Sequence, residues 1–206
     1  MSQYPTPDQI VSLSTVCVGV GLGGSTSMLA CVSLTIAGGE PLLDTFVRPT
    51  MQVTDYRAAT TGIQDSQLFS STQMPFLQTP LEDAVSFDQL QQHVANTLSG
   101  KIVVGHCLWN DLSVIGVPHP AVSTRDVALY QPFSNALKSP HRIIGLQTLC
   151  WEFMRRRCQH GLVDPIEDSR VAIDLYRSHA TEWETTILRC NWPSSLPPST
   201  FSGCYL

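Results

Sequence analysis

The first quarter of the chain contains three stretches in which apolar and β-branched residues run together or alternate with small polar ones: 11–20, 28–36 and 42–47. Runs of this length and composition predict β-strands. The glycine-rich segment Gly21–Ser27 separates the first two stretches, and Gly38-Gly39 provides the next turn. Because these connections are short, we expect the three strands to form an antiparallel meander.

Helical periodicity appears in the second half of the chain. Apolar residues at positions 87, 90, 94 and 98 share one helix face, with Ser86 as the N-cap and Gly100 at the end. A long helix is predicted from the pair Asp164-Pro165, an N-cap followed by proline at the first helical position, to about Arg189. Between these helices the pattern predicts a buried strand, a short helix, an extended segment and a further helix, at 101–105, 109–115, 124–129 and 146–157.

This order of elements predicts an α/β fold of ribonuclease H type, with a mixed central sheet flanked by helices. We expect one domain over 11–189, preceded by a short extension at 1–10. An insertion at about 64–85 holds several apolar residues and two prolines, and long loops of this kind are often functional. The proline- and serine-rich residues 190–206 are predicted to form a C-terminal tail.

Composition narrows the classes of partner and compartment. The chain of 206 residues has a formal net charge of −5, with 12 basic and 17 acidic residues, which disfavours strong general binding to nucleic acid. A local basic patch remains open, formed by Lys138, His141, Arg142 and 155–157, although cations also suit a helix end. Seven cysteines without zinc spacing predict reduced thiols in an intracellular protein of the nucleus or cytoplasm, not a secreted one. The uncharged run 9–39 is interrupted by polar and glycine residues, so we expect two buried strands and no membrane span.

Five segments, in this order along the chain, carry a more specific signal: LDTFVRP at 43–49, VTDYRAATTGI at 53–63, VGHCLWNDL at 104–112, Arg125-Asp126, and EDSRVAIDLYR at 167–177. Together they resemble the DEDDh 3′→5′ exonucleases of the RNA exonuclease 4 and interferon-stimulated exonuclease group. The resemblance covers roughly residues 11–185. It implies the ribonuclease H-like exonuclease fold and phosphodiester chemistry with two Mg²⁺ or Mn²⁺ ions.

The resemblance also implies five catalytic positions, of which this chain keeps two. The carboxylate pair of the first strand falls on Ser14 and Val16, and the histidine that serves as general base falls on Val163. Asp111 and Asp168 match the two remaining aspartates. Hard divalent ions need oxygen ligands, so we expect no resident cofactor, or at most weak binding of Mg²⁺ or Mn²⁺ by Asp111 and Asp168.

Neighbouring residues offer further candidates. His160 could replace the missing base if a local bulge brought it to the site. Trp109 could stack a base or be part of the core, and His106 could bind a ligand or hold backbone near the site. Asp126 matches a family position outside the metal cluster and is expected to be structural. Cys17 is predicted to be a core thiol that points away from Val16.

The leading hypothesis is therefore a catalytically degenerate exonuclease homologue that acts as a binding or scaffold module, for RNA or for a protein partner. A protein partner could dock on the 64–85 insertion or on the C-terminal tail. The first alternative is a 3′→5′ exoribonuclease with residual metal-dependent activity through Asp111 and Asp168. The second alternative is a cleft reused for metal-free chemistry on a small molecule, for which the apolar, cysteine-bearing first strand is the only support in the sequence. Valines at positions 16 and 163 make the cleft less charged, which suits an apolar ligand or an inserted peptide better than a phosphate.

Overall fold

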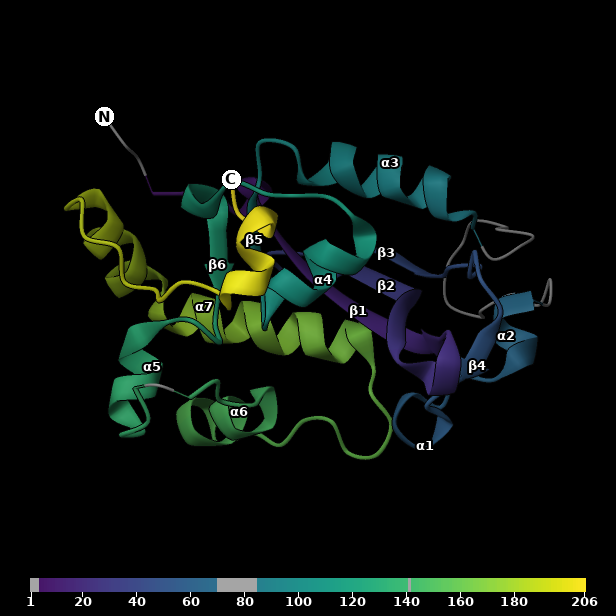
Figure 1. Ribbon diagram of the computed structural model, residues 1–206. Helices are drawn as coiled ribbons and strands as arrows, with labels where there is room; N and C mark the ends of the chain where they lie inside the picture. The colour runs from purple at the N-terminus through teal and green to yellow at the C-terminus, as the bar shows by residue number, and fades with distance from the viewer. Residues whose placement is uncertain (1–3, 70–84, 141) are drawn as a thin grey trace.

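A computed structural model describes residues 4–69, 85–140 and 142–206. Its sheet has the strand order β3-β2-β1-β5-β6, and the short strand β4 also pairs with β1 (Figure 1). The strands are β1 Ile10–Val20, β2 Thr26–Ile36, β3 Pro41–Phe46, β4 Val53–Asp55, β5 Ile102–Gly105 and β6 Thr124–Asp126. β1, β2 and β3 form an antiparallel meander, and β5 and β6 add to it in parallel. The predicted mixed sheet is confirmed.

The helices are α1 Ala58–Thr61, α2 Asp65–Phe69, α3 Phe87–Leu98, α4 Leu108–Ile115, α5 Gln131–Ala136, α6 Leu146–Met154 and α7 Pro165–Leu188. Four short 3₁₀ turns complete the described elements: η1 Pro7–Gln9, η2 Leu22–Gly24, η3 Ala121–Ser123 and η4 Ser199–Cys204. α6 and α7 lie on one side of the sheet, and α3 and α4 lie on the other (Figure 1). No described helix has the length and apolar composition needed to cross a membrane.

The alternation of side chains along β1 divides the core between these two layers. Ile10 packs with the apolar residues of α6 and α7, whereas Val11 and Leu13 pack with those of α3 and α4. Ser12 lies on the α7 side, where its hydroxyl donates to the Ser169 carbonyl at 2.8 Å. β1 therefore lies at the centre of the domain, with its successive residues facing opposite helical layers.

One edge of β1 is only partly covered by strands. Opposite β2, the described residues pair with β1 at 10–12, through β5, and at 19–20, through β4. β5 ends at Gly105, which lies so close to β1 that a Cβ there would come within 2.8 Å of the Leu13 carbonyl oxygen. The chain then enters α4 at Leu108. The middle of β1 thus faces α4 instead of a neighbouring strand.

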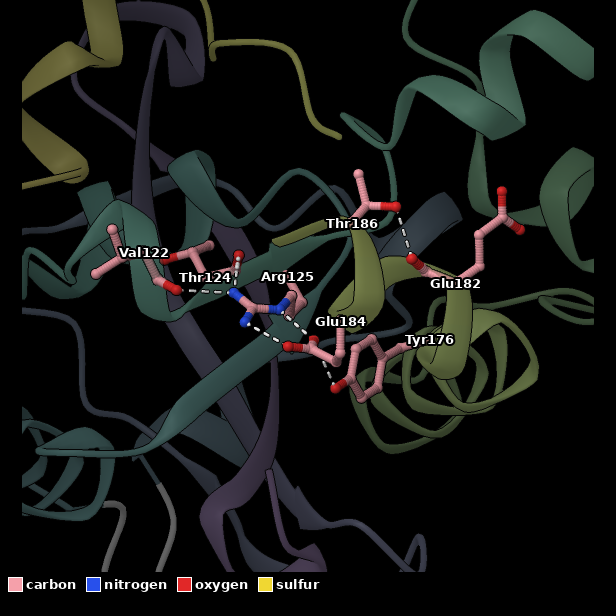
Figure 2. Close-up of polar contacts among 7 residues, drawn as sticks. All are labelled: Val122, Thr124, Arg125, Tyr176, Glu182, Glu184 and Thr186. Atoms are coloured by element: carbon pink, nitrogen blue, oxygen red, sulfur yellow. Dashed lines mark hydrogen bonds and ion pairs between the residues drawn. The ribbon is translucent and has the colours of Figure 1, made fainter. Parts of the chain in front are cut away.

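A buried ion pair joins β6 to α7 (Figure 2). The Arg125 guanidinium donates to both carboxylate oxygens of Glu184, at 2.7 and 3.0 Å, and also to the carbonyls of Val122 and Thr124. The Tyr176 hydroxyl donates to Glu184 at 2.9 Å. Each charged group is thereby matched by several partners, which offsets the cost of removing it from water.

The local structure differs from the sequence-based expectations in two places. The helix predicted over 146–157 ends at Met154, because Arg155 adopts a left-handed conformation with φ of 52°. α5, α1 and α2 lie where no helix was expected, and residues 70–84 of the predicted insertion, like His141 of the basic patch, lie outside the described residues.

The residues expected to form a C-terminal tail are packed on the domain. η4 lies beside α4 (Figure 1), and backbone hydrogen bonds join His119 to Cys204 and Leu206. The Tyr205 hydroxyl donates to Asp126 at 3.0 Å. Composition suggested a tail, but these bonds attach the segment to the rest of the domain.

Candidate functional site

Asp111 lies on α4 and reaches the uncovered edge of β1. One of its carboxylate oxygens accepts hydrogen bonds from the Thr15 amide at 3.1 Å and from the Thr15 hydroxyl at 2.6 Å. The side chain is buried, and this burial raises the pKa of Asp111 well above its ordinary range; the Thr15 hydroxyl opposes the shift, and the nearby carboxylates of Asp126 and Asp168 add to it. Burial therefore favours the neutral form of the Asp111 carboxyl group, and the hydrogen bonds from Thr15 oppose this effect.

Asp168 lies in the first turn of α7, at the same end of the sheet. The Gln159 side-chain amide donates to both of its carboxylate oxygens, at 2.7 and 2.8 Å. Burial raises the pKa of Asp168 to about 6, against the opposing effect of the Gln159 hydrogen bonds, while the negative charges of Glu167 and Asp164 raise it further. Both retained aspartates are thus bound by neutral donors of the chain itself.

Val16 and Val163, which stand at two of the catalytic positions that the resemblance implies, belong to one apolar cluster. Val16 follows Ser12 and Ser14 on the α7 side of β1, and it is buried with Ile63 and Leu68. Val163 packs against the same cluster, and its amide donates to the Thr60 carbonyl at 2.8 Å. A glutamate and a histidine at these two positions would have faced one another; the valines make an apolar wall instead.

A pocket of about 590 Å³ opens on this wall. Its lining is mainly apolar and includes both valines with Phe46, Ile63, Leu162 and Ile166. Asp44, Asp164 and Arg170 supply its charged groups. The pocket could accept an apolar side chain or a small apolar molecule.

The residues present do not fit a pair of divalent ions. Among the described residues, no group of three or more histidine, cysteine, aspartate or glutamate side chains is arranged to hold a metal. Asp111 and Asp168 are already engaged by Thr15 and Gln159, and Val16 offers no ligand atom. No chemical step at this site is therefore assigned to a metal ion.

The curated relatives that match this chain are RNA exonucleases. RNA exonuclease 4 from Cryptococcus neoformans is 36% identical over 183 residues, which are 89% of this chain and 41% of that protein. RNA exonuclease 4 from Homo sapiens is 34% identical over 175 residues, or 85% of this chain and 38% of that protein. Over most of its own length this chain is similar to RNA exonuclease 4 proteins, the group of DEDDh exonucleases that its motifs resemble. It spans about two fifths of the length of these curated relatives, and no family model matches it.

Solved structures agree on the fold. The exonuclease-containing module of Saccharomyces cerevisiae Pan2, solved in complex with AAUUAA RNA, superposes with a TM-score of 0.69 at 23% identity, over 88% of this chain and 30% of that chain. The catalytic unit of Neurospora crassa Pan2 gives a TM-score of 0.68 at 21% identity over 92% of this chain. The ribonuclease H-like exonuclease fold expected from the order of elements is confirmed.

Within this DEDDh exonuclease fold, His160 does not take the place of the missing base. Its side chain is exposed and lies beside Arg156 and Arg157, in a pocket on the outer side of α7. The residue that contacts Asp168 is the preceding one, Gln159. The hypothesis that a bulge brings His160 to the site is wrong.

Trp109 and His106 also differ in their suitability for ligands. Trp109 is only 4% exposed and packs with Leu129 beneath the C-terminal segment, which agrees with the alternative that it is part of the core. His106 hydrogen-bonds the Ile144 carbonyl at 2.8 Å through Nε2, which supports the expectation that it holds backbone near the site.

Asp126 and Cys17 have the structural roles that were expected. The Asp126 carboxylate accepts the amides of Cys107 and Leu108, at 3.0 and 2.8 Å, and so fixes the start of α4. Cys17 is largely buried, and burial with the nearby Asp111 charge raises its pKa to about 11, so its thiol is neutral at physiological pH.

Sequence reasoning missed Thr15 and Gln159, the two residues that bind the retained aspartates. Thr15 carried a usable signal, because alternation places it on the opposite face from Ser14 and Val16, toward α4. Gln159 carried none, since its position depends on the left-handed backbone that it adopts in the loop, with φ of 54°.

Proposed function

We propose that this chain is a catalytically degenerate exonuclease homologue that works as a binding module. The observation that carries the proposal is the apolar contact cluster shared by Val16 and Val163, at the two positions where the resemblance implies a metal-binding glutamate and a general base. The internal donors support it, because Thr15 binds one carboxylate oxygen of Asp111 and Gln159 binds both oxygens of Asp168.

The same pocket favours an apolar partner over a phosphate backbone. Metal assistance contributes several kcal/mol to transition-state stabilisation, and nothing on the Val16–Val163 wall replaces it. An apolar side chain of a protein partner would instead bury surface there at about 25 cal/mol per Å². The Pan2 module was solved with RNA; for this chain, a net charge of −5 and the apolar wall argue for a protein segment as the ligand.

A nuclease assay tests the loss of activity. The purified chain is incubated with single-stranded RNA and single-stranded DNA in Mg²⁺ or Mn²⁺, beside RNA exonuclease 4 from Homo sapiens as the active comparison. We expect no trimming above the level of an Asp111→Asn, Asp168→Asn double variant. Asparagine keeps an acceptor for Thr15 and for Gln159, so this control should stay folded.

The second candidate function, residual exonuclease activity through Asp111 and Asp168, rests on the names of the relatives. It would be established by Mn²⁺-dependent 3′ trimming that the double variant lacks. Calorimetric titration with Mn²⁺ adds an independent measurement: the proposal expects no saturable heat, whereas a one-site isotherm removed by Asp168→Asn would contradict it.

A further inference from the structure

The loop that follows α6 folds back on that helix. α6 ends at the left-handed Arg155, and four residues later the Gln159 carbonyl accepts a hydrogen bond from the Gln147 side chain at 3.1 Å. Gln147 and Cys150 are three residues apart and share a helix face. The bond to Gln147 therefore brings the preceding loop residue, Cys158, over Cys150.

The two cysteines are neighbours in the core. Cys150 and Cys158 belong to the same buried cluster against α7. All seven cysteines are free thiols in the structure. Seven residues separate the pair, so a disulfide between them would close only a short loop.

The pair differs slightly in exposure. Both cysteines are buried, Cys150 fully and Cys158 with 4% of its surface exposed, and Cys158 lines a pocket of about 260 Å³ together with Trp151, Arg157 and His160. In the same segment, the Arg156 guanidinium binds Asp174 at 2.8 Å. A reagent would approach the pair from this pocket, on the Cys158 side.

We propose that Cys150 and Cys158 form a reversible disulfide that responds to low-molecular-weight disulfides such as oxidised glutathione. The Cys158 thiolate attacks one sulfur of oxidised glutathione, a mixed disulfide forms, and one glutathione thiolate leaves. The Cys150 thiolate then attacks the Cys158 sulfur, which releases the second glutathione. In the balanced reaction two protein thiols are oxidised to one disulfide, and one oxidised glutathione is reduced to two glutathione molecules.

The environment of Cys158 determines the rate of closure. Burial and the neighbouring Cys150 raise the pKa of Cys158 to about 12, so only a small fraction is thiolate at pH 7. Because the thiolate is the nucleophile, the closing rate is expected to rise about tenfold per pH unit between roughly pH 7 and 9. Such a pair responds to sustained oxidation and not to brief exposure.

The disulfide would act on the former catalytic centre through Gln159. This residue follows Cys158 directly; its amide side chain holds Asp168, and its backbone amide donates to Glu167 at 2.8 Å. Closing the loop between residues 150 and 158 would fix the segment that leads to Val163 and to the apolar pocket. The inference does not depend on the proposed function, because the disulfide can form whether or not the centre is active.

Peptide mapping of the full chain gives a direct test, because the three arginines at 155–157 lie between the cysteines. The protein is equilibrated in glutathione buffers of increasing oxidised fraction, free thiols are alkylated, and trypsin is added without reductant. We expect the peptide 143–155 linked to the peptide 158–170, as one species that reductant separates. The Tm of the oxidised protein should rise by several degrees and return on reduction.

Cys190 provides the matched control, since it is exposed. Cys190→Ser should leave the linked species unchanged, whereas Cys158→Ser should abolish it. Cys158→Ala serves the same purpose if the serine variant does not fold. Recovery of Cys150 and Cys158 as free thiols under conditions that glutathionylate Cys190 would overturn the proposal, and so would linkage of Cys158 to any other cysteine.

Discussion

Two regions of this domain bury carboxylates, and they do so in opposite ways. Glu184 receives two charged hydrogen bonds from Arg125 and one from Tyr176, so its charge is compensated inside the protein. Among the described residues, Asp111 and Asp168 receive hydrogen bonds from the neutral donors Thr15 and Gln159, and burial raises the pKa of both. A cation keeps a buried carboxylate ionised, whereas neutral donors only reduce the cost of burying it.

The two regions also differ in their place in the fold. The Arg125–Glu184 ion pair joins β6 to α7. Asp111 and Asp168 are bound by Thr15 and Gln159, which are neutral donors of the same chain.

The largest expected effect comes from removing one partner of the buried Arg125–Glu184 ion pair. Glu184→Ala leaves the Arg125 guanidinium buried without its counterion and should reduce the free energy of unfolding by about 4 kcal/mol. Urea denaturation measures the loss. Glu152→Ala removes the exposed partner of Arg155, at 3.5 Å, and should change stability by less than about 0.5 kcal/mol. Equal effects of the two variants would remove the distinction between the regions.

Restoring a family carboxylate should also be costly. Val16→Glu places an acid in the apolar cluster beside Ile63, in the pocket that Asp164 also lines, and we expect a loss of about 3 kcal/mol at pH 7. Val16→Ile, which changes only volume, should cost less than about 1.5 kcal/mol. If Val16→Glu proved as stable as the wild type in denaturant, the site would still be adapted to a carboxylate.

The pH dependence of stability is a further expected difference between the Asp168 region and the Arg125–Glu184 ion pair. The pKa of Asp168 is about 6 in the folded protein and lies above its unfolded value, so the folded state holds this proton more tightly. Stability from this group is therefore full below about pH 4 and is lost as the pH rises through about 6. Asp168→Asn should be more stable than the wild type by about 2 kcal/mol at pH 7 and equal to it near pH 4. A constant difference between the two proteins across this range would contradict the assignment.

The smallest effect concerns the donor on Asp168. Gln159→Ala removes both hydrogen bonds to the carboxylate and should lower stability by about 1 kcal/mol at pH 7. It should also raise the pKa of Asp168 further, which an NMR titration of the side-chain carboxyl carbon would detect. Gln147→Ala is the control, because it loses the contact with the loop backbone but leaves the Asp168 bonds in place.

Local patterns predicted most of the fold. The strands of the meander, α3 and the start of α7 were predicted because their signals lie within a few residues: alternation, helical spacing, and the Asp164 cap that accepts the Ile166 amide at 2.9 Å. The end of α6 was predicted wrongly, because nothing in the sequence around Arg155 marks a left-handed residue. The C-terminal segment was also misjudged, since its order depends on partners as distant as His119 and Asp126.

The candidate site was predictable in part for the same reason. The family motifs located Asp111, Asp168 and the three substituted positions, because those positions are fixed along the chain. Which donors the aspartates would find in place of a metal depends on three-dimensional proximity, and so Thr15 and Gln159 were missed. The meeting of Val16 and Val163 follows from the fold only once β1 and the loop before α7 are placed beside each other.

The uncovered edge of β1 gives Asp111 a reason to persist that has nothing to do with cutting nucleic acid. A strand edge with free amides invites pairing with another chain, and proteins commonly block such edges. Asp111 places a carboxylate oxygen where the carbonyl of a neighbouring strand would lie, and the Thr15 amide binds it at 3.1 Å. Asp111 thereby blocks part of this edge against pairing with another chain, a role that does not depend on metal binding.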